Sequence, residues 1–356
     1  MIKRLRTPKF WYDKKHSAGK ILSPLSSIYS FLANIRYSSI LPSKTDVPVI
    51  SVNSVMISGA GKTPTVALVY DILRNLGFTP HILTRGYSGY IKNVIQVNPT
   101  LHSYLQVGDE SLVSAQFAPT WIGRNHFKES KAAIFGGADI LVVDSGFYCR
   151  TLFKDFNILV IDANQQFGNE RLLPAGPLIE PVDNGIKNAD MVLIIGNKSE
   201  DLEKRITSIK NVKICYASLQ VSEPVLVENN KVLGFCGLGY PQNFKKTLID
   251  CKYEIVDFVA FADHHPYTIT EIQRLIEKAS SVNATLVTTL KDYVKIPEVF
   301  RSEVKVIPVK VVPSDNTFIE IISAIVSRTN KQNLQNINID QATTHRTNTK
   351  AKQKQK

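Results

Sequence analysis

The chain has 356 residues and an ordinary balance of apolar (44%) and charged (21%) residues, which excludes disorder along its whole length. At roughly 100–200 residues per domain, this length predicts about two domains. The net charge of +12 suggests nucleic-acid binding until the charge is located. Residues 1–36 contain eight Lys and Arg against one Asp, and residues 328–356 contain seven against one Asp. The body between these ends therefore has a net charge of only −1, which disfavours a nucleic-acid partner.

The N-terminal region predicts a helix that rests on a membrane surface. There is no uninterrupted apolar run of about 18 residues, so we expect no spanning helix. A signal peptide with a small-residue cleavage site is not found either. In residues 21–37, helical spacing places one set of side chains on one face: Leu25, Ile28, Tyr29, Leu32 and Ile35. Such a face can also pack on its own domain, but the basic neighbours and the aromatic residues 10–12 favour the membrane interface.

Strands and helices are expected to alternate along the rest of the chain. Apolar runs predict strands at residues 47–52, 79–84, 138–143, 157–161 and 191–195, and a helix over 65–76. The pattern then restarts, with strands expected at 232–235, 253–258, 284–288 and 304–308 and helices at 243–250, 270–280 and 318–327. This alternation predicts an α/β fold with mostly parallel sheets. We expect four regions: a basic segment over 1–45, a first domain over 46–215, a smaller domain over 216–328, and a disordered basic tail over 329–356.

The strongest local pattern predicts a phosphate-binding loop between a strand and a helix. Its residues are Ser58, Gly59, Ala60, Gly61, Lys62, Thr63 and Pro64. Backbone N–H groups and the positive helix end would face a phosphate, with Lys62 at the β- and γ-phosphates and the Thr63 hydroxyl on Mg²⁺. The full pattern would have Gly at position 56, where this chain has Met56. A glycine-rich turn with a chance lysine is the alternative, which the flanking strand and helix disfavour.

Three further clusters carry acids or histidine. Asp109 and Glu110 lie in a glycine-led turn and could serve as a base and a metal ligand, although a solvated turn explains them as well. Asp144 ends an apolar strand, where its carboxylate could hold Mg²⁺ beside the phosphate loop or cap the next turn. His264, in an Asp-His-His run, could act as a general base, orient one, or be structural.

Taken in order, these features resemble the tetraacyldisaccharide 4′-kinase family of the lipid A pathway. The similarity extends over residues 8–300 and is strongest in seven stretches. These are residues 58–64 (SGAGKTP), 84–87 (TRGY), 107–110 (VGDE), 167–169 with 172–178 (FGN, LLPAGPL), 235–239 (FCGLG), 262–265 (ADHH) and 288–292 (TTLKD). The run at 172–178 is the most specific, because no general requirement of nucleotide binding explains it.

The resemblance implies a fold of two α/β/α lobes, with the phosphate loop in the first and the active site in the cleft between them. The implied reaction transfers the γ-phosphate of ATP, with Mg²⁺, to the 4′-hydroxyl of a tetraacylated glucosamine disaccharide 1-phosphate. The family's base, an Asp partnered by a His, maps to Asp109 and His264, with Lys62 at the phosphates. Its metal ligands map to Thr63, Glu110 and Asp144.

The implied partners are the glycolipid and a membrane. The protein is expected to be a peripheral monomer on the cytoplasmic face of the bacterial inner membrane, held there by its N-terminal helix. No nucleic-acid partner is expected.

The chain departs from the family pattern at several positions. The family has Asp-Asp-Gly-Phe-Gln-His where residues 144–149 read DSGFYC, so Ser145 replaces the second acid. Leu290 replaces the Glu of Thr-Glu-Lys-Asp, and Ile179 replaces the Arg that follows Pro-Ala-Gly-Pro-Leu. Asp162, at the end of the next strand, is a positional candidate for the missing acid or else a turn cap.

These departures keep alternatives open. The first is a divergent membrane-associated nucleotide-binding protein with weak or no kinase turnover. The others are a nucleic-acid-dependent ATPase and a P-loop kinase for a soluble substrate.

Overall fold

The computed structural model describes residues 7–38, 40–145 and 150–327. The predicted tail over 329–356 lies outside these residues, as does part of the basic N-terminal segment. Among the described helices, none is long and apolar enough to cross a bilayer. Contacts divide the chain into a unit that ends at Asp315 and a unit that begins at Asn316, in which residues 317–327 are helical as expected.

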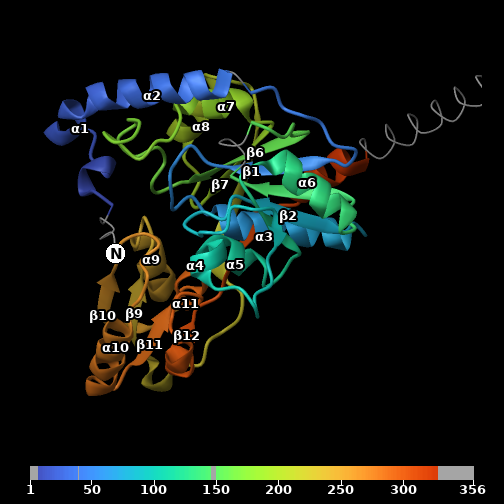
Figure 1. Ribbon diagram of the computed structural model, residues 1–356. Coiled ribbons are helices and arrows are strands. Elements are labelled where there is room, and N and C mark those ends of the chain that lie inside the picture. Colours follow the sequence, from blue (N-terminus) through green and yellow to red (C-terminus); the bar gives the residue numbers. More distant parts are fainter. Residues whose placement is uncertain (1–6, 39, 146–149, 328–356) are drawn as a thin grey trace, which may run out of the picture. The chain divides into compact units, whose positions relative to one another are not determined.

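The larger sheet has nine strands in the order β13-β8-β7-β6-β1-β5-β2-β4-β3. Figure 1 labels four of them, β1, β2, β6 and β7. Its central strands pair in parallel, and only the edge strands β3 and β13 pair antiparallel. The strands are β1 (Val49–Asn53), β2 (Pro80–Thr84), β3 (Ile95–Gln96), β4 (Thr120–Ile122), β5 (Ile140–Asp144), β6 (Phe156–Asp162), β7 (Met191–Ile195), β8 (Lys213–Val221) and β13 (Val309–Pro313). Their continuous apolar runs are explained by burial on both faces, since every residue of β1, β2, β5 and β7 is buried.

Helices connect these strands and cover the sheet. They are α3 (Lys62–Asn75), α4 (Tyr104–Val107), α5 (Asp109–Ser114), α6 (His126–Phe135), α7 (Val182–Asn188) and α8 (Glu200–Thr207). Helix α3 buries Val66, Val69 and Leu73, which recur at helical spacing, and it contacts β1, β2 and β5. This packing fixes the start of α3 at the carboxyl end of β1, where ligands bind in parallel sheets.

The smaller sheet has four parallel strands in the order β10-β9-β11-β12. Its elements are β9 (Lys231–Cys236), α9 (Gln242–Asp250), β10 (Glu254–Ala260), α10 (Ile269–Ser281), β11 (Thr285–Thr288), α11 (Leu290–Tyr293) and β12 (Lys305–Val306), with short 3₁₀ turns at Glu228–Asn230 and Glu298–Glu303. We call this part the second lobe and the part built on the larger sheet the first lobe. Two mostly parallel α/β sheets confirm the predicted fold class.

The larger sheet includes strands from both of the expected domain ranges. The boundary expected after residue 215 falls inside β8, which pairs with β7. Strand β13 comes after the whole second lobe in sequence and returns to pair with β8. The second lobe is therefore inserted between two strands of the first lobe's sheet. The four domain ranges expected from the sequence remain a prediction.

The N-terminal helices turn an apolar face outward. A 3₁₀ turn, η1 (Lys9–Tyr12), precedes α1 (Ser17–Ile21) and α2 (Ser23–Ser38). Six apolar side chains on α1 and α2 are at least half exposed: Ile21, Leu25, Ile28, Phe31, Leu32 and Ile35. The opposite side of α2 is polar and docked, because Ser26 Oγ donates to the carbonyl of Leu172 at 2.7 Å. Helical spacing predicts Tyr29 on the same face as these apolar side chains, but its hydroxyl donates to the Ile179 carbonyl at 3.2 Å.

Candidate functional site

The predicted phosphate loop lies between β1 and α3. All of residues 58–64 line a cavity of about 930 Å³. Gly59 and Gly61 have φ of +85° and +82°, in the left-handed region that side chains disfavour. Lys62 and Thr63 are the first residues of α3, with Gly61 at its N-cap. The loop that sequence reasoning predicted is thus at the N-terminus of a 14-residue helix.

The loop presents unpaired backbone donors. Within the described part of the chain, no protein atom accepts a hydrogen bond from the N–H of Ala60, Gly61, Lys62 or Thr63. Four consecutive N–H groups at the positive end of a helix form an anion-binding arrangement. This geometry fits the phosphates of a nucleotide.

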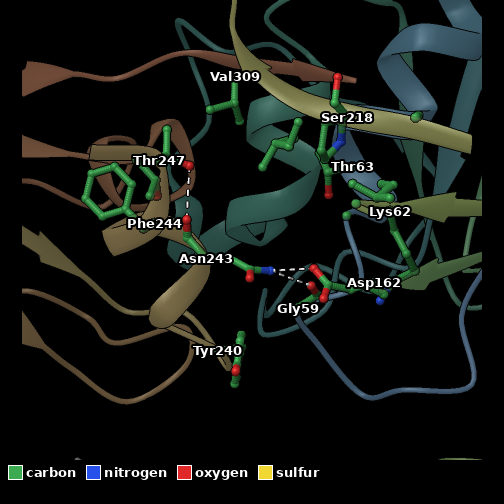
Figure 2. A pocket seen from close by; sticks show the side chains of 18 of the residues that line it. Gly59, Lys62, Thr63, Asp162, Ser218, Tyr240, Asn243, Phe244, Thr247 and Val309 are labelled. Atoms are coloured by element: carbon green, nitrogen blue, oxygen red, sulfur yellow. Dashed lines mark hydrogen bonds between the residues drawn. The ribbon is translucent and has the colours of Figure 1, made fainter. Parts of the chain in front are cut away.

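The second lobe reaches the same cavity. Leu238, Gly239, Tyr240 and Asn243 line it opposite the loop, as Figure 2 shows for Tyr240 and Asn243. Gly239 lies so close to the loop that a Cβ there would collide with the Ser58 side chain. The cavity is therefore a cleft between the two lobes, as the resemblance implied.

Asp109 of the first lobe and His264 of the second are brought together beside this cleft, which their chain neighbours Glu110 and Asp263 line. They are 155 residues apart, yet His264 Nδ1 lies 2.7 Å and 2.8 Å from the two carboxylate oxygens of Asp109. Asp109 is almost fully buried at the start of α5. His264 adopts φ +56°, which is uncommon for a residue other than glycine. The exposed ring of Tyr87 packs against the imidazole at 5.2 Å between centroids.

Two lysines compensate the acids around this pair. Lys291 Nζ donates to Glu110 at 3.0 Å and lies 3.6 Å from Asp263. Lys295 Nζ, buried, lies 3.6 Å from Asp109. Burial alone would raise the pKa of Asp109, but Lys291, His264 and Lys295 outweigh burial and hold this pKa well below its usual range. The Asp109 carboxylate is therefore ionised at neutral pH.

Glu110 and Asp144 are the candidate metal ligands with Thr63. Burial and the neighbouring Glu110 together raise the pKa of Asp144 to about 6, against the opposing effect of Lys62. One carboxylate oxygen of Asp144 is buried and has no hydrogen-bond partner among the residues that the structure describes. A buried acid beside a second acid, with an oxygen left unpaired, fits a nearby cation.

The protein groups alone do not form a complete metal cage. Among the described residues, no group of three or more His, Cys, Asp or Glu could hold a metal ion. Mg²⁺ is commonly bound by one or two carboxylates with phosphate oxygens and water, and Thr63, Glu110 and Asp144 fit that arrangement.

Comparison with known proteins identifies the family. The sequence profile of LpxK, described as tetraacyldisaccharide-1-P 4′-kinase, matches residues 18–327. The chain belongs to the tetraacyldisaccharide 4′-kinase family. It is 36% identical to the tetraacyldisaccharide 4′-kinase of Rhodospirillum centenum, a match that covers 86% of this chain and 92% of the relative. It is 38% identical to that of Gluconobacter oxydans, covering 87% and 94%.

A solved structure has the same fold. The crystal structure of LpxK from Aquifex aeolicus, an "apo" form in complex with ATP, superposes with a TM-score of 0.67. The sequences are 24% identical, and the match covers 87% of this chain and 99% of that one.

The departures from the tetraacyldisaccharide 4′-kinase pattern have structural explanations. Ser145 Oγ donates to Asp144 at 3.1 Å, so the residue that replaces the second acid supports the first. Leu290 packs against the apolar cluster of Val107 and Leu112, and Ile179 is buried. Two further departures, Tyr148 for Gln and Cys149 for His, lie outside the described residues.

Asp162, the positional candidate for the missing acid, lines the cavity and makes the hydrogen bonds of a turn cap. Its Oδ1 accepts the backbone N–H groups of Asn164 and Gln165, and its Oδ2 accepts from Asn243. It therefore caps the turn after β6, which was the alternative considered for it.

Several residues of the site were missed by sequence reasoning. Lys291 was recognised only as part of a shared stretch, and Lys295, Gln165 and Asn243 were not singled out. Lysine is almost never fully buried unless it is paired, so the burial of Lys295 is informative. Its nearest partner is local, since Lys295 Nζ lies 2.9 Å from Asp292 Oδ1, three residues earlier, whereas its second partner, Asp109, is revealed only by the tertiary structure.

Proposed function

We propose that this protein transfers the γ-phosphate of ATP to the 4′-hydroxyl of a tetraacylated glucosamine disaccharide 1-phosphate, a step of lipid A biosynthesis. The observation that carries the proposal is the meeting of two features at one cleft. On one side lies a loop with four N–H donors that have no acceptor in the described part of the protein. The Asp109–His264 pair lies beside it, since their chain neighbours Glu110 and Asp263 line the same cavity. Family membership supplies the acceptor class.

Each group has a role that its position supports. The loop N–H groups and Lys62 bind and orient the phosphates, and Mg²⁺ held by Thr63, Glu110 and Asp144 supplies charge neutralisation when bound. Asp109 accepts the proton of the sugar hydroxyl, and His264 holds the carboxylate in place. A low pKa is compatible with this role, because a loose transition state depends more on how the hydroxyl is oriented than on a strong base.

The exposed apolar face of α1 and α2 supports membrane association. We propose that this face rests on the cytoplasmic surface of the inner membrane and that the protein acts there as a peripheral monomer. An acylated substrate leaves the bilayer only at high cost, because each buried CH₂ contributes about 0.8 kcal/mol. An enzyme at the surface reaches the sugar without extracting the acyl chains.

The test is transfer of labelled γ-phosphate from ATP to tetraacyldisaccharide 1-phosphate in detergent micelles with Mg²⁺. Wild type is compared with Lys62→Ala, Asp109→Ala and the exposed control Glu277→Gln. We expect product from wild type and the control, with a loss of at least about 100-fold in kcat for each site variant.

Absence of product from wild type, with ATP binding intact, would contradict the proposal. That outcome would favour the divergent nucleotide-binding protein, with the change at Ser145 as its cause. Product from a soluble sugar analogue but not from the glycolipid would instead indicate a kinase for a soluble substrate.

A further inference from the structure

The carbonyl oxygen of Gly59 is held by two carboxamides from distant parts of the chain. Gln165 Nε2 donates to this oxygen at 2.8 Å, and Asn243 Nδ2 does so more weakly at 3.4 Å. Gln165 is buried in the turn after β6, whereas Asn243 lies in the first turn of α9 in the second lobe. Figure 2 shows the Asn243 side chain directed at both Gly59 and Asp162.

Asp162 contacts the Asn243 carboxamide directly and holds Gln165 through its backbone. Its Oδ2 accepts from Asn243 Nδ2 at 2.8 Å, and its Oδ1 accepts the backbone N–H of Gln165 at 2.9 Å. Asp162 is itself buried at the carboxyl end of β6. A central strand of the first lobe therefore sets the position of both side chains that hold the loop.

Holding this carbonyl determines where the next N–H points. In a planar trans peptide, the C=O of Gly59 and the N–H of Ala60 point in opposite directions. The two carboxamides lie on the carbonyl side, so the Ala60 N–H is turned away from them. It has no protein acceptor within the described residues, and Ala60 lines the cavity.

Glycine at position 59 makes this restraint necessary. A glycine at φ +85° has few steric limits, so the peptide after it can rotate unless its carbonyl is held. The close approach also requires glycine, because a Cβ would lie 2.8 Å from Gln165 Nε2. The glycine thus allows the loop several backbone conformations, and the hydrogen bonds from Gln165 and Asn243 select one of them.

We propose that Asn243 and Gln165 are positioning residues of the phosphate loop. They hold the Gly59–Ala60 peptide so that the Ala60 N–H faces a phosphate of the bound nucleotide. Because Asn243 comes from the second lobe, the nucleotide site in the first lobe is incomplete without it. The inference rests on the proposed function only in taking a nucleoside triphosphate as the ligand.

The experiment compares Asn243→Ala and Gln165→Leu with wild type in the full chain. Gln242→Ala is the matched control, since Gln242 is the exposed neighbour of Asn243 on α9. Calorimetry gives the Kd of ATP with Mg²⁺, and steady-state assays give kcat and separate KM values for ATP and glycolipid. We expect each variant to raise the Kd and KM for ATP about tenfold, with kcat and the glycolipid KM within about twofold of wild type.

Two results would overturn the proposal. One is an ATP Kd within about twofold of wild type in both variants. The other is a parallel rise of both KM values with a lower Tm, which would indicate a general structural role. If wild type binds ATP but transfers no phosphate, the calorimetric comparison still decides the positioning role, so failure of the kinase assignment is distinguished from failure of this inference.

Discussion

At the scale of single residues, Lys291 is the cation shared by the acids of the site. It contacts Glu110 and Asp263, and its Nζ lies 3.4 Å from His264 Nε2. Burial would lower its pKa, but Glu110, Asp263 and Asp109 raise this pKa well above its usual value. We predict that Lys291→Met lowers kcat at least about 100-fold and the free energy of unfolding by about 2 kcal/mol, because buried acids lose their counter-charge. Steady-state kinetics and urea unfolding measure the two effects.

Lys291→Arg is the control, because it keeps the charge with a different shape. It should recover most of the stability and only part of kcat. If Lys291→Met unfolded at the wild-type urea concentration and turned over normally, Lys291 would be a solvated lysine near the site rather than part of it.

Ionisation of the Glu180 carboxyl group destabilises the folded protein at neutral pH. Burial raises its pKa from 4.5 to about 7, with Arg150 opposing. Within residues 7–38, 40–145 and 150–327, one of its carboxylate oxygens has no hydrogen-bond partner. An acid whose pKa is higher in the folded state binds its proton more tightly there, so stability falls as pH rises from 4.5 to about 7. We predict that Glu180→Gln raises the free energy of unfolding by about 2 kcal/mol at pH ~8 and by less than about 1 kcal/mol at pH ~5. Thermal unfolding at both pH values measures the difference, and the exposed Glu277→Gln should change neither. A gain equal at both pH values would show that ionisation is not its cause.

At the scale of elements, α2 reverses the usual placement of an amphipathic helix. Its serine side is docked on the body, and its apolar side faces outward. We predict that Ile28→Ser with Leu32→Ser weakens binding to phospholipid vesicles at least about tenfold, because each side chain loses the gain of leaving water. Val299→Ser, at another exposed apolar position, is the control and should bind as wild type does. Vesicle sedimentation measures binding, and kcat in micelles should be unchanged. Wild-type sedimentation of the double variant would mean that this face does not meet the membrane.

The elements also show what could be predicted from sequence. The phosphate loop could be predicted from the sequence, because its signal is local. A strand, small residues and the start of a helix all fall within 16 residues, 47 to 62. The docking of α2 could not be predicted, because an apolar periodicity identifies one face of a helix but not whether that face packs on the protein or points outward. The pairing of β13 with β8 could not be predicted either, because strands separated by an inserted lobe show no local sequence pattern that pairs them. Asp109 and His264 were each ambiguous as residues, and only the family resemblance paired them.

At the scale of the whole molecule, the site depends on contacts that span both lobes. Asp109 meets His264, Glu110 meets Lys291, and Asp162 meets Asn243, each pair with one member in each lobe. These contacts are polar, and each needs the correct partner at hydrogen-bond distance. This explains why Gln165 and Asn243 were missed: their role exists only once the second lobe is in place.

The distribution of charge over the molecule predicts how it meets a membrane. The first 36 residues carry an excess of seven positive charges, whereas the body between the two basic ends is near neutral. Lys9, Lys15 and Lys20 are exposed and lie before or within α1. Lysines near an anionic surface each contribute about 1 kcal/mol, so replacing all three with Gln should weaken binding to phosphatidylglycerol vesicles about 100-fold at low salt. The same triple replacement at the exposed body lysines Lys128, Lys213 and Lys310 should have little effect.

Salt separates this electrostatic contribution from the apolar one. At about 1 M salt the Debye length is about 3 Å, so the lysine variant and wild type should bind alike. The Ile28→Ser, Leu32→Ser variant should remain weaker than wild type at every salt concentration, because burial of apolar surface is not screened. If the lysine variant also stayed weaker at high salt, its lysines would act through packing of the N-terminal segment. If neither variant differed from wild type at low salt, the membrane contact would have to lie on a different face of the molecule.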